Sequence, residues 1–534
     1  MVSVSISRRL PGLALAVLLA GAAVPSAAQV SGFALGVAQA AAEDDAIAAF
    51  YRARDFAGLW TGVDAQAMAR RNALLGALAA APAHALPGDR FDPAALMARM
   101  QAATGAGERG AMDVEMSRML AAWARAVGTG ILDPGSIYGM NKRERRALDV
   151  TALLEDFAQS RDPVSFLQGL APASPEYARL MAARLSLLDS VAAGGWGQQV
   201  QAERLAPGDQ GTQVVALRDR LAAMGYLAPS VTAEYDGAIA EAVRSFQEAH
   251  GLEPDAVAGA STIAEINRSP EERLRAVTVA MERERWLGPE RGERHIWVNL
   301  TDFTARIVDE DVITFETRAV IGATASDRQS PEFSDEMQYL VLNPSWYVPR
   351  SIVVGEYLPQ LQRNPHAVGH IRVIDSRGRI VNRSAANFSQ YSARSFPYSM
   401  VEPPSAGNAL GIVKFMFPNP WAIYLHDTPS RSLFGREVRA FSHGCIRLQD
   451  PRDFAHALLA RQTDDPVGMF NTILNTGAET RVDLEEPVPI HLDYRTAFTD
   501  ADGRLQFRRD VYGRDARIWE ALVAEGVEAP GVQG

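Results

Sequence analysis

The chain has 534 residues and a formal net charge of −11 at pH 7, with hydrophobic residues at 47% and charged residues at 22%. These proportions are ordinary for a soluble globular protein. A chain of this length exceeds what one hydrophobic core can support, so we expect about two to four domains. The acidic balance disfavours nucleic acid as the main partner, because phosphate recognition requires a basic surface.

Residues 1–40 are predicted to be an export signal. They combine a short cationic start with an apolar run and with small residues suited to cleavage. These features are Arg8 and Arg9, the run from Leu13 to Val24, and the triplets Ser26-Ala27-Ala28 and Ala38-Gln39-Ala40. No other stretch of the sequence is apolar and long enough to span a bilayer, so the mature chain is expected to have no membrane span unless the signal stays uncleaved.

Residues 43–200 are predicted to form a helical scaffold domain. Apolar side chains recur there at helical spacing, and no group of titratable residues has the spacing of metal ligands. The clearest helical stretches are 112–127, 150–157 and 177–191. We therefore expect this domain to hold or position a substrate rather than to react with it.

A compact module follows at 205–268, where the sequence predicts three short helices ended by glycines. The module resembles the peptidoglycan-binding domain that is appended to cell-wall enzymes. The resemblance rests on Gly208-Asp209, Val214, Leu217, Leu221, Gly225-Tyr226, Phe246-Gln247, Gly251-Leu252, Asp255, Gly259 and Thr262. Most of these are core and turn positions, so they identify the fold better than a ligand site.

The sequence becomes β-rich after Trp286, which predicts a sheet-based domain over 290–475. A long stretch rich in Pro, Gly, Ser and Asn interrupts it at 343–417, and long loops inside a domain are usually functional lids. Residues 476–534 are predicted to form a C-terminal hairpin, turning at 500–503, and a tail. The expected class is therefore α+β and multidomain, with a helical N-terminal scaffold, a three-helix module and a β-rich domain with a lid.

The chain has one cysteine, Cys445. In an exported protein it cannot form an internal disulfide, so it is either a buried apolar residue or a reactive thiol. A free thiol outside the cytoplasm is liable to oxidation. Its retention therefore favours a chemical role.

A thiol needs a base, because only a few per cent of it is thiolate at pH 7. His426 is the candidate base, at the end of the predicted strand 423–427, and His443 is its competitor. Residues two apart on one strand lie about 7 Å from each other, whereas a residue on an adjacent strand lies about 5 Å away. This difference favours His426.

The residues around Cys445 have further candidate roles. The backbone N–H groups of Gly444 and Cys445 could hold a developing oxyanion. Ser442 is interpreted as a hydrogen-bonding support, and His443 either shapes the oxyanion site or reacts directly. Arg447 either contacts a substrate carboxylate or pairs with Asp450 or Asp453, of which Asp450 is the expected N-cap of the following helix.

The strings His426-Asp427 and Ser442-His443-Gly444-Cys445-Ile446-Arg447-Leu448 resemble the active-site signature of L,D-transpeptidases of the YkuD type. Asp335-Glu336-Met337 and Asn343-Pro344-Ser345-Trp346 extend the match upstream. The domain organisation is similar to that of the large periplasmic subgroup of Gram-negative bacteria, which implies a periplasmic location. One departure is Ser330-Pro331-Glu332-Phe333, where smaller members commonly have Thr-Pro-x-Gly.

The resemblance implies that 290–475 is the catalytic domain and that it needs no cofactor or metal. Cys445 would attack the carbonyl of the third residue of a tetrapeptide stem, usually meso-diaminopimelate, and release D-alanine from a thioester. An amine of another stem would then form a 3→3 cross-link. His426 would transfer the proton, oriented by a backbone carbonyl, while Ser442, His443, Gly444 and Arg447 shape the site.

Two other functions stay open from the sequence. A cysteine L,D-carboxypeptidase or endopeptidase would pass the same thioester to water, and a non-catalytic scaffold would only bind peptidoglycan. The expected partners are stem peptides and glycan, with other wall synthases as further candidates. His366 and His370 have the spacing of a metal pair, but Pro365 and Gly369 indicate a loop, so no metal site is predicted.

Overall fold

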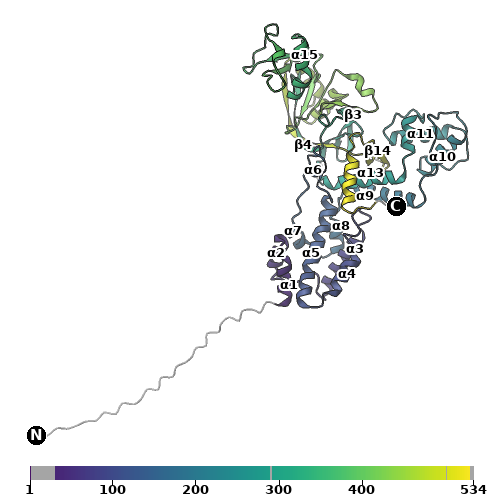
Figure 1. Ribbon diagram of the computed structural model, residues 1–534, viewed down its shortest axis with the longest axis vertical. Helices are drawn as coiled ribbons and strands as arrows, with labels where there is room; N and C mark the ends of the chain where they lie inside the picture. Colours follow the sequence, from purple (N-terminus) through teal and green to yellow (C-terminus); the bar gives the residue numbers. More distant parts are fainter. Residues whose placement is uncertain (2–30, 289–290, 501, 529–534) are drawn as a thin grey trace.

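The structure is a computed structural model that describes residues 1, 31–288, 291–500 and 502–528. The cationic start, the apolar run and the first cleavage triplet of the predicted signal lie outside the described residues. Within the described part of the chain, no helix has both the length and the apolar character needed to cross a membrane. Figure 1 shows the β-rich domain, which we call the catalytic domain after the expectation above, over the helical scaffold, with the three-helix module to one side of both.

The scaffold is a bundle of nine helices in the described residues. Helix α1 lies within the stretch assigned above to the export signal, yet Val37 and Ala41 are buried. A Cβ at Gly36 would come within 2.1 Å of the Gly107 carbonyl oxygen, so α1 packs directly on α5. The bundle therefore begins at 32 instead of 43. Its helices are α1 (Gly32–Ala41), α2 (Asp45–Ala53), α3 (Ala65–Ala79), α4 (Pro93–Ala102), α5 (Ala106–Thr129), α6 (Pro134–Ile137), α7 (Val150–Gln159), α8 (Pro163–Gln168) and α9 (Pro175–Ala192).

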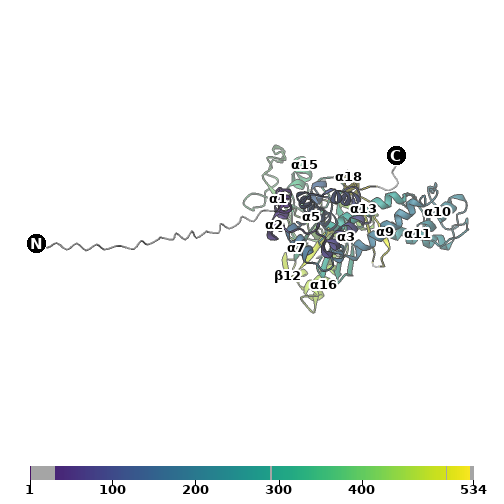
Figure 2. The same cartoon turned by 90° about the horizontal axis from the view of Figure 1, so that it is seen from below.

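The three-helix module has the predicted fold. Its helices are α10 (Thr212–Ala223), α11 (Gly237–Ala249) and α12 (Ala260–Ile266), which enclose a separate apolar core around Leu217, Val243 and Phe246. Figure 2 shows α10 and α11 projecting away from the rest of the molecule.

Helix α13 (Pro270–Trp286) joins the parts of the molecule and was not predicted. Four consecutive charged residues near its end, 282–285, are buried. Arg285 bonds Glu282 at 2.7 Å, and Arg283 bonds Glu332 of the catalytic domain at 2.6 Å. Buried charges of this kind need close partners, so α13 is fixed by the surrounding domains.

The catalytic domain is built on one sheet that closes on itself. The strand order is β10-β3-β11-β9-β8-β4-β12-β1-β2, and β2 also pairs with β3. An apolar core fills the enclosed space. The strands are β1 (Arg294–Asn299), β2 (Thr304–Asp309), β3 (Val312–Gly322), β4 (Phe333–Leu342), β8 (Val413–Met416), β9 (Leu425–His426), β10 (Ala440–Ser442), β11 (Ile446–Leu448) and β12 (Thr480–Asp493).

The predicted domain end at 475 is wrong, because β12 lies in the middle of this sheet. It pairs antiparallel with β4 and parallel with β1. The hairpin that follows, β13 (Ala497–Thr499) and β14 (Leu505–Phe507), is shorter than predicted. Three helices complete the domain and its tail: α16 (Pro451–Leu459), α17 (Pro466–Leu474) and α18 (Arg514–Ala524).

The insertion expected to be irregular at 343–417 is a folded lid with its own core, which includes Val353, Leu361 and Phe388. Its end also differs from the prediction, since β8 belongs to the main sheet. We call 343–410 the lid. It contains β5 (Trp346–Tyr347), α14 (Arg350–Ile352), η1 (Val353–Tyr357), α15 (Leu358–Arg363), β6 (Arg372–Ile374), η2 (Phe388–Gln390) and β7 (Ser399–Glu402).

Candidate active site

Strands β9 and β11 bring the two predicted reactive residues to one face of the sheet. The strands are parallel, with Ile446 opposite Leu425 and Arg447 opposite His426. Side chains alternate between the two faces of a strand. Ile446 and Leu425 are both fully buried in the core. The neighbouring residues 424, 426, 445 and 447 therefore share the other face.

His426 is held as a neutral base. Its Nδ1 lies 2.5 Å from the Asp427 backbone carbonyl, which can only accept, so Nδ1 bears the proton and Nε2 is free to take another. Burial, with a smaller contribution from the Arg447 charge, lowers the pKa of His426 to about 3. The imidazole is thus unprotonated at neutral pH, as a proton acceptor must be.

The Cys445 sulfur is partly exposed and lies against the segment 422–424. Sγ is 3.7 Å from the Ala422 carbonyl oxygen. Burial raises the pKa of the thiol to about 11, although hydrogen bonds from the Tyr424 backbone N–H and hydroxyl act in the opposite direction. The resting group is therefore a thiol rather than a thiolate.

The pairing of β9 with β11 differs in one respect from the sequence analysis, which expected His426 to lie directly across from Cys445. By the β9–β11 pairing, the residue across from Cys445 is Tyr424, and His426 lies one step diagonal to it. Among the described residues the thiol donates to the Ala422 carbonyl, and no hydrogen bond joins it to the imidazole. Catalytic hydrogen bonds often form only once substrate is bound.

The loop before Cys445 is fixed from within. Gly444 has φ +115°, a conformation that favours glycine. Its N–H donates to Ser442 Oγ at 3.1 Å, and Ser442 Oγ donates to the Cys445 carbonyl at 2.5 Å. The Gly444 N–H is thus engaged and does not supply the predicted oxyanion donor in this state. The Cys445 N–H stays available, because no bond is made to it in the described chain.

Ser330 holds the same loop from outside, at the point where the sequence departs from Thr-Pro-x-Gly. The fully buried Ser330 hydroxyl donates to the Gly444 carbonyl at 2.6 Å and accepts from the Gly322 N–H at 2.9 Å. Glu332, two residues later, enters a buried ion cluster with three arginines. The segment 330–332 therefore ties the loop before Cys445 to the domain interface.

His443, the competing base, faces the lid. It is exposed, and its Nε2 lies 2.7 Å from Glu356 Oε1 in the lid. Glu356 also pairs with Arg328 at 3.0 Å. The structure thus places His443 and Glu356 at a contact between the lid and the loop before Cys445.

We expect Glu356→Gln to speed alkylation of Cys445 by iodoacetamide by up to about fivefold, since part-exposed ion pairs contribute at most about 1 kcal/mol. The variant weakens the contact between the lid and the loop, so the lid opens more often. Cys445 is the one cysteine in the chain, so adduct mass reports it alone. Asp375→Asn is the matched control, because Asp375 pairs within the lid with Arg379 at 2.8 Å. Equal rates for the two variants would contradict the expectation.

Arg447 makes neither of the predicted structural ion pairs. Asp450 instead accepts a hydrogen bond from the Thr317 hydroxyl at 3.0 Å, and in the described residues Arg447 has no carboxylate partner. Its Nε is buried without a hydrogen bond. Asp450 occupies the N-cap position of α16, but its side chain does not cap the helix. The Arg447 guanidinium is therefore free to bind an anionic group beside the thiol.

No metal site is evident in the part of the chain that the structure describes, where no three His, Cys, Asp or Glu side chains gather as ligands. His366 and His370 are both exposed in the lid.

Tyr424 is the residue that the sequence analysis missed. Its proximity to Cys445 depends on the strand register, which the sequence did not indicate.

Comparison with known families agrees with the domain organisation. Residues 293–482 match the model described as the L,D-transpeptidase catalytic domain (YkuD), residues 45–183 a scaffold domain, and residues 210–266 a "Putative peptidoglycan binding domain". A "Putative L,D-transpeptidase" of Haemophilus influenzae is 29% identical over 225 residues. That match covers 42% of this chain and 45% of the relative, so the chain spans less than half of the relative's length.

Two solved structures are also similar to this chain. One, an L,D-transpeptidase from Xylanimonas cellulosilytica, is 14% identical and covers 55% of this chain and 100% of its own, with a TM-score of 0.17. The other, an L,D-transpeptidase from Stackebrandtia nassauensis, is 12% identical and covers 56% of this chain and 98% of its own, with a TM-score of 0.22.

Proposed function

We propose that this chain, whose residues 293–482 form an L,D-transpeptidase (YkuD) catalytic domain, joins peptidoglycan stem peptides by 3→3 cross-links through a thioester on Cys445. The observation that supports this most is the shared face of β9 and β11. On that face the residue with the single thiol lies one step diagonal to a neutral imidazole whose Nδ1 is held by the Asp427 carbonyl, which supports the proposal.

In the first half-reaction, Sγ of Cys445 attacks the carbonyl carbon of the third residue of a tetrapeptide stem. Nε2 of His426 takes the thiol proton, and the Cys445 N–H stabilises the oxyanion. The tetrahedral intermediate collapses with cleavage of the amide bond. The imidazolium returns its proton to the departing amine, so D-alanine leaves and a thioester remains.

In the second half-reaction, the side-chain amine of another stem attacks the thioester. His426 accepts a proton from that amine, the new amide forms, and the sulfur leaves and recovers the proton as a thiol. Arg447 is placed to bind a carboxylate of the stem, because its guanidinium has no ion-pair partner among the described residues. A bidentate pair of this kind fixes the position of the reacting carbonyl.

The lid favours transfer to an amine over hydrolysis. It contacts the nucleophile loop through Glu356, and it contacts Tyr424 through a hydrogen bond from Trp346. A closed lid excludes water from the acyl-enzyme. We propose further that the protein is periplasmic and that the module 205–268 holds peptidoglycan near the catalytic domain.

The direct test is to incubate the purified protein with disaccharide-tetrapeptide muropeptides and to identify products by mass spectrometry. We expect dimers with a 3→3 bond and released D-alanine from the wild type, and neither from Cys445→Ala. A carbapenem should add to the wild type as one adduct that the variant lacks. Free tripeptide without dimers would identify a hydrolase, and an unmodified substrate would contradict both activities.

A further inference from the structure

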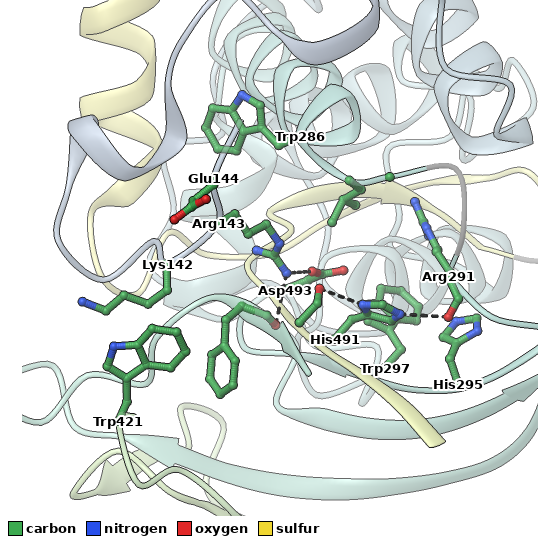
Figure 3. A pocket seen from close by; sticks show the side chains of 14 residues that line it. Lys142, Arg143, Glu144, Trp286, Arg291, His295, Trp297, Trp421, His491 and Asp493 are labelled. Atoms are coloured by element: carbon green, nitrogen blue, oxygen red, sulfur yellow. Dashed lines mark hydrogen bonds and ion pairs between the residues drawn. The ribbon is translucent and has the colours of Figure 1, made fainter. Parts of the chain in front are cut away.

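A cavity of about 350 Å³ lies where the scaffold, the end of α13 and the catalytic sheet meet. Figure 3 shows the side chains around it, with Trp421 and Lys142 at one end and His295 at the other. Trp421 is exposed, its ring lies 4.7 Å from that of Phe333, and the Lys142 ammonium is 5.8 Å from the Trp421 ring. The cavity is separate from the residues that surround Cys445.

Of the charged side chains that line the cavity, Lys142 and Glu144 have no ion-pair partner in the described residues. Asp493 is paired with Arg143 at 2.6 Å, and Arg291 is paired with Glu284 at 2.8 Å. Lys142 has no carboxylate partner in the described residues and donates to the backbone carbonyl of Gly139. Glu144 is exposed, whereas Lys142 lies against the Trp421 ring. The ligand group that matches the Trp421 end of the cavity is therefore an anion.

The floor of the cavity is rigid and neutral. His491 bonds Ser334 Oγ through Nδ1 at 2.8 Å and the Arg291 carbonyl through Nε2 at 2.9 Å. Burial lowers the pKa values of His295 and His491, so both are uncharged at neutral pH. A preformed cavity of this size accommodates a sugar ring or a few amino-acid residues.

We propose that this cavity is a second peptidoglycan-binding site, which takes an anionic glycopeptide with its ring on Trp421 and a stem carboxylate on Lys142. The inference rests on the proposed function for the identity of the ligand. The exposed aromatic face of Trp421 suits the C–H face of a pyranose, and Lys142 suits a carboxylate. A muropeptide contains both groups, joined at short distance.

The site is placed to communicate with the nucleophile. Trp421 is followed by Ala422, whose carbonyl lies 3.7 Å from the Cys445 sulfur and whose φ is +54°. A ligand on Trp421 would thus be able to shift the segment 422–424, against which the Cys445 sulfur lies. It would also bridge the scaffold segment at 142–144 and the catalytic sheet.

The chain has only two lysines, Lys142 and Lys414. The acetylation rate of each lysine therefore reports whether a ligand covers its surroundings. Lys414 lies opposite His426 in the pairing of β8 and β9, so it reports the catalytic face. The experiment treats full-length Cys445→Ala with an amine-acetylating reagent, with and without a disaccharide-tetrapeptide muropeptide, and measures acetylation of each lysine by peptide mass spectrometry. We expect the muropeptide to slow acetylation of both lysines.

Variants at the cavity test its part in this protection. Trp421→Ala should weaken protection of Lys142 by about tenfold and leave that of Lys414 unchanged, whereas Trp421→Phe should retain both. In calorimetry, Lys142→Gln should reduce the number of muropeptide sites by one relative to the wild type.

The outcomes separate the two proposals. Protection of Lys414 alone at saturating muropeptide would overturn the second site and leave the proposed function standing. Protection of Lys142 alone would support the second site and count against catalysis at Cys445. If neither lysine were protected, both proposals would be overturned.

Discussion

Replacement of His426 by alanine is expected to slow acylation of Cys445 at pH 7 by between about a hundredfold and ten-thousandfold, the usual contribution of a positioned base. In the wild type the imidazole takes the thiol proton as the bond to carbon forms. In His426→Ala only the thiolate reacts. With the thiol pKa raised to about 11 by burial, the thiolate is roughly one part in ten thousand at pH 7.

The pH dependence distinguishes this explanation from misfolding. The rate of the variant should rise about tenfold per pH unit as pH approaches the thiol pKa, because each unit multiplies the thiolate fraction by that factor. The wild-type rate should be flat around neutrality and fall in acid as His426 becomes protonated near its pKa of about 3.

The measurement is the mass increase of the chain on reaction with a carbapenem, followed over time at several pH values. His370→Ala is the matched control, since His370 is exposed in the lid. The control should acylate at the wild-type rate. A His426→Ala variant that keeps its fold and its full rate at pH 7 would show that another group activates the thiol.

The residues of this site could be predicted because its signature is local in sequence. Ser442 to Arg447 form one continuous loop and strand. A reactive thiol needs a base, and His426, at the end of a predicted strand, is a nearby candidate. The scaffold helices α5, α7 and α9 could also be predicted, since their apolar periodicity does not depend on distant partners.

The rest of the site depends on pairings that the sequence does not indicate. Tyr424 approaches the sulfur because of the register of β9 against β11. The residues of β12 were assigned to the C-terminal hairpin and tail. Glu485, Glu486 and Pro487 interrupt the strand pattern, and the pairing with β4 accommodates them by a register shift between Asp483 and Val488. Long-range pairing, rather than local propensity, decides these features.

Helix α13 was not predicted for the same reason, because the burial of its charged residues also depends on distant partners. A run such as Glu282 to Arg285 normally indicates a solvated helix face. Here the run is buried because its partners come from distant segments, including Tyr177, Glu332 and Asp515. No local pattern identifies such partners, so the helix that joins the domains was missed.

Glu332 lies at the centre of this junction, and Glu332→Ala is expected to destabilise the catalytic domain by about 3–5 kcal/mol. The carboxylate is almost fully buried. It pairs with Arg283 at 2.6 Å and Arg514 at 2.8 Å, with Arg143 at 3.8 Å, and it accepts from the Tyr138 hydroxyl at 2.8 Å. Its removal leaves three cations without their common counter-ion in a poorly solvated space.

The pH dependence of this contribution follows from the pKa of Glu332. Burial alone would raise that pKa, but the charges of Arg283, Arg514 and Arg143 outweigh it and lower the pKa below its usual 4.5. A carboxyl group with a lowered folded pKa stabilises the fold at pH values above its unfolded pKa and loses that contribution as pH falls through the folded one. The difference between wild type and Glu332→Ala should therefore be constant above about pH 5 and shrink in stronger acid.

The measurement is urea denaturation followed by tryptophan fluorescence. Glu336→Ala, an exposed change on β4, the strand that begins directly after Glu332, is the control. Glu332→Ala should also lower the acylation rate of the folded protein, because Ser330 then holds the Gly444 carbonyl less firmly.

Adding Arg514→Ala should cost less stability in the Glu332→Ala background than in the wild type, since one uncompensated cation is removed. Strict additivity of the two changes would show that the arginines do not depend on Glu332, and the cluster would not be what joins the catalytic loop to the domain interface.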